Sequence, residues 1–87
     1  MQILVRTHHP EAAQLRETVE RRARFAFRRL NALVPRADIK LDDINGPRGG
    51  ADKRCQIALR TDGAGPVVVV SVAKDWRCAL DKALASA

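Results

Sequence analysis

The longest helical pattern in the chain covers residues 11–33 and reads EAAQLRETVERRARFAFRRLNAL. Placing one residue every 100° around a helix gathers six apolar side chains on one stripe. They are Leu15, Val19, Ala23, Ala26, Leu30 and Leu33. The stripe predicts a helix over residues 11–33 that is buried along this side, and Pro35 is expected to end it.

The opposite side of the same segment is rich in arginine. Arg21, Arg24 and Arg28 lie on the outer face, Arg22 and Arg29 on one shoulder, and Arg16 on the other. Glu17 and Glu20 can pair with arginines one turn later, which offsets only part of the charge. The planar guanidinium group suits phosphate, whereas a merely soluble helix more often mixes lysine with glutamate. This side therefore indicates an anion-binding surface.

The composition indicates a single domain over residues 1–87 with an anionic partner. The chain carries a net charge of +6, and 46% of its residues are hydrophobic, which argues against disorder. Nucleic acid or an acidic membrane surface would match the charge. No apolar run approaches the ~18 residues of a membrane span, and the first six residues do not form a signal peptide. We therefore expect a cytoplasmic protein without a membrane partner.

Four segments alternate or are apolar as strands are: residues 2–7, 37–44, 53–61 and 67–72. Asp75 is a suitable N-cap for a second helix, whose apolar positions are Trp76, Ala79, Leu80, Ala83 and Leu84. The order is then β-α-β-β-β-α, and a right-handed crossover makes the first two strands parallel. The sequence predicts an α+β two-layer sandwich: a four-stranded mixed sheet with two helices on one face.

Aromatic residues and the valine-rich strand raise two alternatives. Phe25 lies off the buried stripe; it could stack on a base, but packing on the second helix is the expected role. Trp76 is expected to be a packing anchor rather than a ligand platform. The strand at residues 67–72 is apolar on both faces, so either its outer face is covered or it supports self-association as a homodimer.

No residue cluster predicts catalysis, a metal or a cofactor. His8 and His9 are adjacent in a loop without a second ligand cluster, and Asp42 and Asp43 point in opposite directions along a strand. Cys55 falls on the apolar face of its strand, and both cysteines are expected to be reduced core or near-core thiols. We therefore expect no enzyme and no small-molecule substrate. A thiol chemistry that uses Cys55 and His8 would require an exposed cysteine with a low pKa.

The loop Asn45-Gly46-Pro47-Arg48-Gly49-Gly50 leaves two interpretations open. Its glycines could turn backbone amides toward an anion beside Arg48, or it could be an ordinary hairpin loop. It lacks the Gly-Lys-Ser/Thr ending of a Walker loop, and it is not a dinucleotide-binding fingerprint.

Four segments together resemble a known family. They are Met1-Gln2-Ile3 with His8-His9; Leu15-Arg16-Glu17 with Val19-Glu20; the loop Asn45 to Gly50 with Asp52-Lys53-Arg54-Cys55; and Asp75 with Ala79-Leu80-Asp81. In this order they resemble the ribosome hibernation-promoting factor and ribosome-associated inhibitor family. The loop with its following strand is the most specific match, and it is typical of a short, single-domain branch.

The resemblance implies a fold similar to double-stranded RNA-binding domains. It also implies binding to ribosomal RNA in the mRNA and tRNA channel of the small ribosomal subunit, which would inhibit translation under stress. Basic residues would contact the RNA. The candidates are Arg21, Arg22, Arg24, Arg28, Arg29, Arg48, Lys53, Arg54, Arg77 and Lys82.

The sequence departs from the family pattern in its second helix. Family members usually continue this helix with further basic residues, whereas here it ends Ala83-Leu84-Ala85-Ser86-Ala87. Either the sequence is cut short there or its ribosome affinity is reduced. Trp76 is followed by Arg77 where the prototype has another apolar or aromatic residue, and the long C-terminal extension that pairs ribosomes in some members is missing.

The alternative function is a generic double-stranded RNA-binding or protein-interaction module. Three aromatic residues and no tyrosine cannot build the stacking platform of an RRM sheet. Binding is therefore expected to use the RNA backbone and its shape, with a strong dependence on salt.

Overall fold

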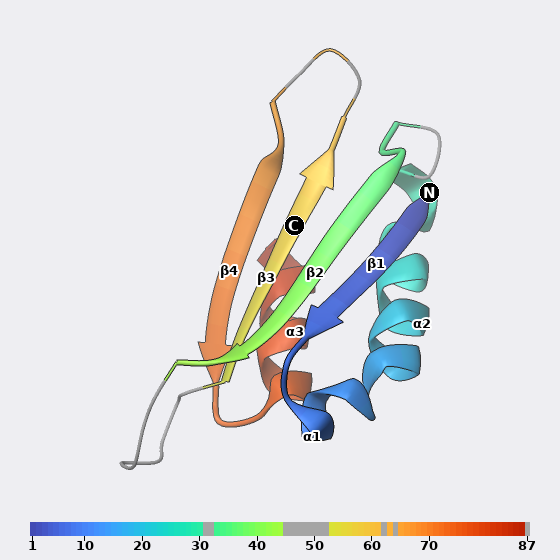
Figure 1. The fold of residues 1–87 in the computed structure, drawn as a ribbon. Helices are drawn as coiled ribbons and strands as arrows, with labels where there is room; N and C mark the ends of the chain where they lie inside the picture. Colours follow the sequence, from blue (N-terminus) through green and yellow to red (C-terminus); the bar gives the residue numbers. More distant parts are fainter. Residues whose placement is uncertain (31–32, 45–52, 62, 64, 87) are drawn as a thin grey trace.

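The computed structural model of the chain describes residues 1–30, 33–44, 53–61, 63 and 65–86, without the side chain of Leu30. The elements follow one another as shown in Figure 1. In order they are β1 (Gln2–Thr7), α1 (Pro10–Ala13), α2 (Arg16–Ala26), the 3-10 turn η1 (Arg28–Leu30), β2 (Arg36–Asp43), β3 (Lys53–Arg60), β4 (Val67–Ala73) and α3 (Trp76–Ser86). The predicted α+β class with a four-stranded mixed sheet is confirmed.

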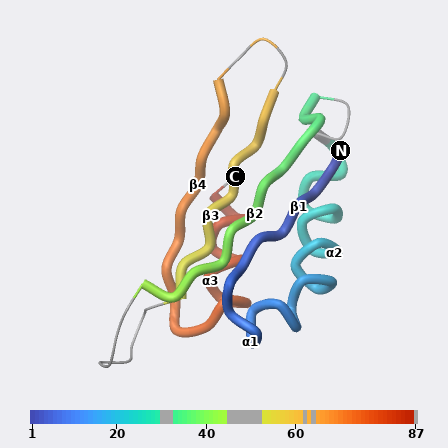
Figure 2. The backbone as a smooth tube through the Cα atoms, viewed as in Figure 1, coloured from blue at the N-terminus to red at the C-terminus, as the bar shows by residue number. Residues whose placement is uncertain are grey.

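The sheet has the strand order β1-β2-β3-β4. β1 runs parallel to β2, and β2, β3 and β4 form an antiparallel meander, as the sequence predicted. The helices α2 and α3 lie on the same side of this sheet, with α2 against β1 and α3 against β3 and β4 (Figures 1 and 2). No helix of the described residues covers the opposite face of the sheet, which is called the open face below.

Strand alternation selects the residues of the core. The register aligns Ile39 of β2 with Ile57 of β3, and both side chains point to the helices and are fully buried. Leu41 and Cys55 form the next buried pair, and Leu80 of α3 packs into the same cluster. Because these residues recur at every second position, the face toward the helices is apolar. The open face mixes the charged residues of β2 and β3 with apolar residues of β1 and β4 such as Leu4, Val68 and Val70.

The predicted helix over residues 11–33 is wrong in its length and continuity. The chain turns at residues 14 and 15, where the backbone N–H of Leu15 donates to the carbonyl of Ala12 at 3.0 Å, and α2 then ends at Ala26. The structure therefore has three α-helices rather than two, the first of only four residues. These breaks separate the predicted helix into α1, α2 and η1.

The buried stripe of α2 differs from the predicted one beyond Ala23. Val19 and Ala23 are buried as expected, but the third position one turn later is Phe27, which is only 3% exposed. Burying the phenylalanine removes far more apolar surface from water than burying Ala26, which is exposed instead. Leu33 is 67% exposed because the helix has already ended. Leu15 is half-buried and packs on the core, and the side chain of Leu30 lies outside the described residues.

α3 is fixed by a cap and by an aromatic anchor. The Asp75 carboxylate accepts the backbone N–H of Cys78 at 2.7 Å, which confirms the predicted N-cap. The Trp76 side chain is 6% exposed and donates its indole N–H to the carbonyl of Asp42 at 3.1 Å, which confirms its role as a packing anchor. Cys78 is exposed, so the expectation of a near-core thiol was wrong for this cysteine. Within the described residues, none of the helices has the length and apolar character of a membrane span.

Candidate nucleic-acid interface

The outer face of α2 carries exposed arginines, with Glu17 and Glu20 beside Arg21 and Arg24. Arg21 and Arg24 are exposed on α2, and Arg28 is exposed in η1 four residues later, so the three form a row that continues from α2 into η1. The guanidinium group of Arg24 pairs with the carboxylate of Glu20 at 2.9 Å, as the sequence predicted, and also donates to the carbonyl of Met1 at 3.4 Å. Glu20 therefore neutralises one arginine of the row.

Arg28 and Phe25 form a cation–π pair at the end of α2. The guanidinium carbon of Arg28 lies 4.2 Å from the centroid of the Phe25 ring, and its Nη1 donates to the carbonyl of Phe25 at 2.7 Å. The ring is nevertheless 69% exposed. The expectation that Phe25 packs on the second helix was therefore wrong, because Phe27 occupies the buried position at the end of α2.

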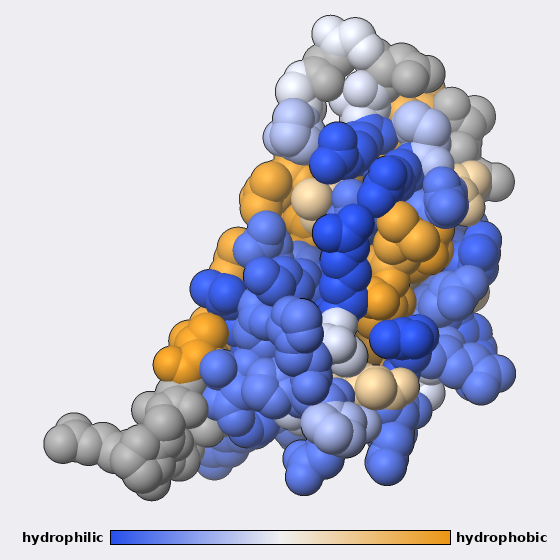
Figure 3. Space-filling view, viewed as in Figure 1, coloured by the Kyte–Doolittle hydropathy of each residue, from blue (hydrophilic) through white to orange (hydrophobic). Residues whose placement is uncertain are grey.

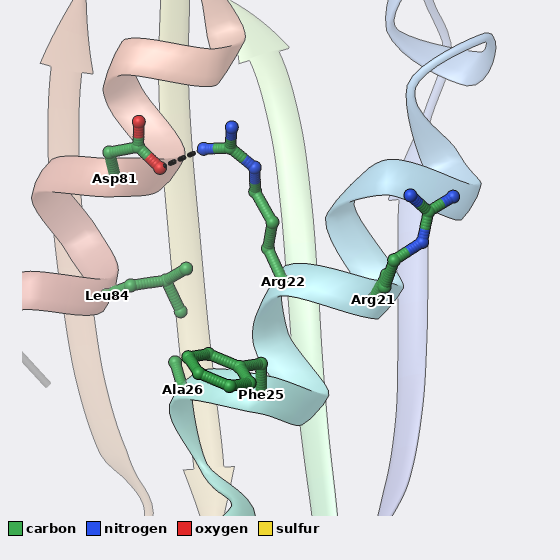
Figure 4. A pocket seen from close by; sticks show the side chains of 6 residues that line it. All are labelled: Arg21, Arg22, Phe25, Ala26, Asp81 and Leu84. Carbon is green, nitrogen blue, oxygen red and sulfur yellow. Dashed lines mark hydrogen bonds and ion pairs between the residues drawn. The ribbon is translucent and has the colours of Figure 1, made fainter.

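A shallow groove separates α2 from α3 beside this pair. It has a volume of about 510 Å³ and is mostly apolar. Figure 4 shows the ion pair that crosses it, in which Arg22 of α2 contacts Asp81 of α3 at 2.5 Å. The groove is lined by Arg21, Arg22, Phe25, Ala26, Asp81 and Leu84.

The two basic candidates of α3 lie on different sides of that helix. Arg77 is four residues before Asp81 and seven before Leu84, which places it on the side of α3 that faces α2. The ammonium group of Lys82 donates to the carbonyl of Val72 at 3.3 Å, so this side chain lies toward β4. Only Arg77 therefore extends the basic surface of α2.

The candidates on β3 do not join that surface. Arg54 points to the open face of the sheet, where it pairs with the carboxylate of Asp42 at 2.8 Å. Lys53 points to the helix side, where it pairs with Asp43 at 2.7 Å and lies 5.1 Å from the ring centroid of Trp76. Arg29 is exposed in η1. Arg48 and its glycine-rich loop lie outside the described residues, so both interpretations of that loop remain predictions.

The charged side chains on the open face of the sheet are held in ion pairs. The carboxylate of Asp38 pairs with Arg36 at 3.0 Å and with Arg60 at 3.3 Å, and Asp42 pairs with Lys40 at 3.8 Å in addition to Arg54. In Figure 3 these hydrophilic side chains cover the middle of the sheet, and hydrophobic atoms follow β4 at its edge. Each of the two carboxylates is shared by two basic side chains, so all four basic groups are ion-paired although four positive charges face two negative ones.

A second basic hollow, which the sequence analysis missed, lies at the β1 edge of the sheet. It has a volume of about 470 Å³ and is lined by Val5, Arg6, Thr7, His8, Arg16 and Lys40. None of these six residues carries a carboxylate. Arg6 and Lys40 meet because the parallel register places them opposite each other, and Arg16 is the first residue of α2. No sequence motif could reveal this hollow, because its residues come from three elements.

The thiols do not have the properties of nucleophiles. Cys55 is fully buried, and desolvation raises the pKa of its thiol to about 12. Cys78 is exposed, but a hydrogen bond to the Asp75 carboxylate and the charge of that carboxylate raise the pKa of the Cys78 thiol as well. In the part of the chain that the structure describes, no three His, Cys, Asp or Glu side chains gather to hold a metal ion. The thiol alternative therefore lacks its required low-pKa cysteine.

Comparison of the chain with protein-family models gives no match, and comparison with curated proteins gives none either.

Proposed function

We propose that this protein is a ribosome-associated translation inhibitor that binds ribosomal RNA in the mRNA and tRNA channel of the small subunit under stress. We further propose that its α+β sandwich is of the double-stranded RNA-binding-domain type. The resemblance of its sequence segments to the hibernation factors supports the choice of the ribosome. The charge distribution supports RNA as the partner.

The observation that carries the proposal is the contrast between the α2 face and the open sheet face. On the sheet, Asp38 and Asp42 each pair with two basic side chains. On α2, Glu20 pairs with Arg24, but no carboxylate of the described residues pairs with Arg21, Arg28 or Arg29. Uncompensated arginine on one side of a small domain is the electrostatic pattern of a phosphate-binding surface.

The hollow at the β1 edge supplies further phosphate contacts. Arg6 and Arg16 bring two guanidinium groups to one hollow, and Arg16 opens α2, where unpaired backbone N–H groups favour an anion. The hollow and the α2 face both recognise the RNA backbone, so affinity should depend steeply on salt.

The first test is co-sedimentation with small ribosomal subunits over a salt series, with an excess of naked duplex RNA as competitor. We expect binding that survives the competitor and weakens as salt rises. Equal loss of binding to duplex RNA would identify a generic double-stranded RNA binder instead. No binding at low salt would contradict the proposal.

The second test is a pair of charge-matched double variants. Arg21→Gln with Arg28→Gln removes two uncompensated guanidinium groups and should lower subunit affinity about tenfold or more, with a salt slope reduced by about two. Arg36→Gln with Arg60→Gln removes the same charge from the ion-paired sheet face and should leave the salt slope unchanged. Equal effects of the two double variants would show that net charge, rather than the α2 face, determines binding.

A further inference from the structure

The groove between α2 and α3 combines an exposed aromatic ring with positive charge. Phe25 is 69% exposed, although it is the larger of the two apolar residues that end α2. In Figure 4 its ring lies between the two helices, with Leu84 on the α3 side and Arg21 on the other. An exposed ring in a hollow can bind a flat apolar group without any rearrangement of the core.

A cation–π contact with Arg28 holds the Phe25 ring in place. The guanidinium group of Arg28 lies 4.2 Å from the ring centroid and is also held by its hydrogen bond to the carbonyl of Phe25. Arg28 therefore covers one face of the ring with a positive charge and leaves the other face for stacking. Arg21 also lines the groove, with its exposed guanidinium group directed away from Phe25 in Figure 4, and no carboxylate of the described residues pairs with either arginine.

An ion pair that crosses the groove offers groups for hydrogen bonding. Arg22 and Asp81 meet across it at 2.5 Å, and their side chains are 43% and 57% exposed. Ala26 and Leu84 supply apolar walls. The groove thus presents an aromatic ring, apolar walls, a donor and acceptor pair, and flanking guanidinium groups.

We propose that this groove binds one unpaired nucleotide of the RNA, with the base stacked on Phe25 and the adjacent phosphates held by Arg21 and Arg28. This inference rests on the proposed function and specifies which RNA element it recognises. An extruded base has a flat face for stacking, polar edges for Arg22 and Asp81, and phosphates on both sides. An apolar peptide side chain would fit the walls but would leave the two arginines without anions, so charge complementarity favours the nucleotide.

The test compares two RNA duplexes that differ by one bulged 5-iodouridine. Wild-type protein should bind the bulged duplex about tenfold more tightly than the fully paired one, a difference typical of stacking on one aromatic side chain. Ultraviolet irradiation should crosslink the iodouridine to Phe25, which peptide mass spectrometry can locate. Phe25→Leu keeps an apolar side chain without an aromatic face, so it should bind both duplexes equally.

Two control variants isolate the aromatic ring. Phe25→Trp should keep the preference for the bulge, and Leu33→Ala should leave it unchanged, because Leu33 is as exposed as Phe25 but does not line the groove. An unchanged preference in Phe25→Leu, or a crosslink elsewhere, overturns the groove proposal alone. Phe25→Leu could instead lose its binding to the small subunit while it binds both naked duplexes as the wild type does. This result would mean that the groove holds a side chain of a ribosomal protein, and it would also overturn the groove proposal. If the wild type binds neither of the two duplexes nor the small subunit, both proposals are overturned.

Discussion

Phe25 and Phe27 are two positions apart at the end of α2. Their side chains therefore point in directions that differ by about 200° around the helix axis. Phe27 lies in the core at 3% exposure, whereas Phe25 is 69% exposed. Composition cannot distinguish two such residues, and neither can hydropathy. Their difference depends on which one follows Val19 and Ala23 at intervals of four residues.

The two phenylalanines should therefore differ in their contribution to stability. Phe27→Ala leaves a cavity in the core and should lower the free energy of unfolding by about 3 kcal/mol or more. Phe25→Ala removes only an exposed ring and its contact with Arg28, so it should change that free energy by about 0.5 kcal/mol. Urea unfolding followed by circular dichroism measures both. Similar losses in the two variants would place Phe25 in the core and contradict the groove.

Cys55 makes stability depend on pH in the alkaline range. Burial raises the pKa of its thiol from 9.0 to about 12, so between these values the unfolded chain releases the proton and the folded chain keeps it. The unfolded state then binds fewer protons, and the free energy of unfolding falls as pH rises, by up to about 1.4 kcal/mol per unit. Below pH 9 this contribution is fully present.

Comparison with Cys55→Ala separates this effect from the titration of lysine ion pairs in the same range. The variant lacks the thiol, so its free energy of unfolding should fall less steeply between pH 9 and pH 11 than that of the wild type. The slopes come from urea unfolding at each pH. Parallel slopes would mean that the Cys55 thiol ionises equally in the folded and unfolded chains.

At the scale of elements, the turn between β3 and β4 requires one particular glycine. Gly63 has a φ of +78°, a conformation that L-residues with a side chain rarely adopt, and a Cβ at this position would meet no atom within 4 Å. Gly63→Ala should therefore lower stability by about 1 kcal/mol through backbone strain alone. Gly65→Ala is the matched control, since it also has open space and lacks the positive φ. Equal melting temperatures for the two variants would rule out the strain.

The strands were predictable from sequence to within one or two residues, because alternation in β2 and β3 directly encodes which face is buried. The long helix was not, since the pattern at residues 11–33 tolerates either Ala26 or Phe27 at the core, and a shift of one residue rotates the face by 100°. For the site, the row Arg21, Arg24 and Arg28 follows from helical periodicity alone. The hollow around Arg6 and Lys40 does not, because it requires the register of two strands that are about thirty residues apart.

At the scale of the whole molecule, charge is distributed unequally between the two edges of the sheet. The β1 edge carries α2 and the basic hollow, while the β4 edge is formed by the uncharged sequence VVVVSVA. Val67, Val68 and Val70 are each about half exposed. Edge strands are usually protected from pairing by charge, proline or a bulge, and within β4 no charge or proline is present. The molecule thus has a basic edge at β1 and an uncharged, unprotected edge strand at β4.

Of the two alternatives for the valine-rich strand, this asymmetry favours self-association and leads to a prediction of its geometry. Antiparallel pairing of β4 with β4 of a second copy would continue the sheet and would keep the two arginine-rich faces at opposite ends, where repulsion between two chains of charge +6 is least.

We predict a concentration-dependent dimer in analytical ultracentrifugation that Val68→Lys with Val70→Lys converts to monomer. Both side chains point to the open face and are more than half exposed, so the variant should keep its fold. As a control, Arg36→Gln with Arg60→Gln changes residues of β2 and β3 on the same face of the sheet and should leave the dimer intact. Because the dimer uses the edge opposite to α2, the lysine variant should also keep its affinity for RNA, and a joint loss of dimer and RNA binding would contradict the separation of the two edges.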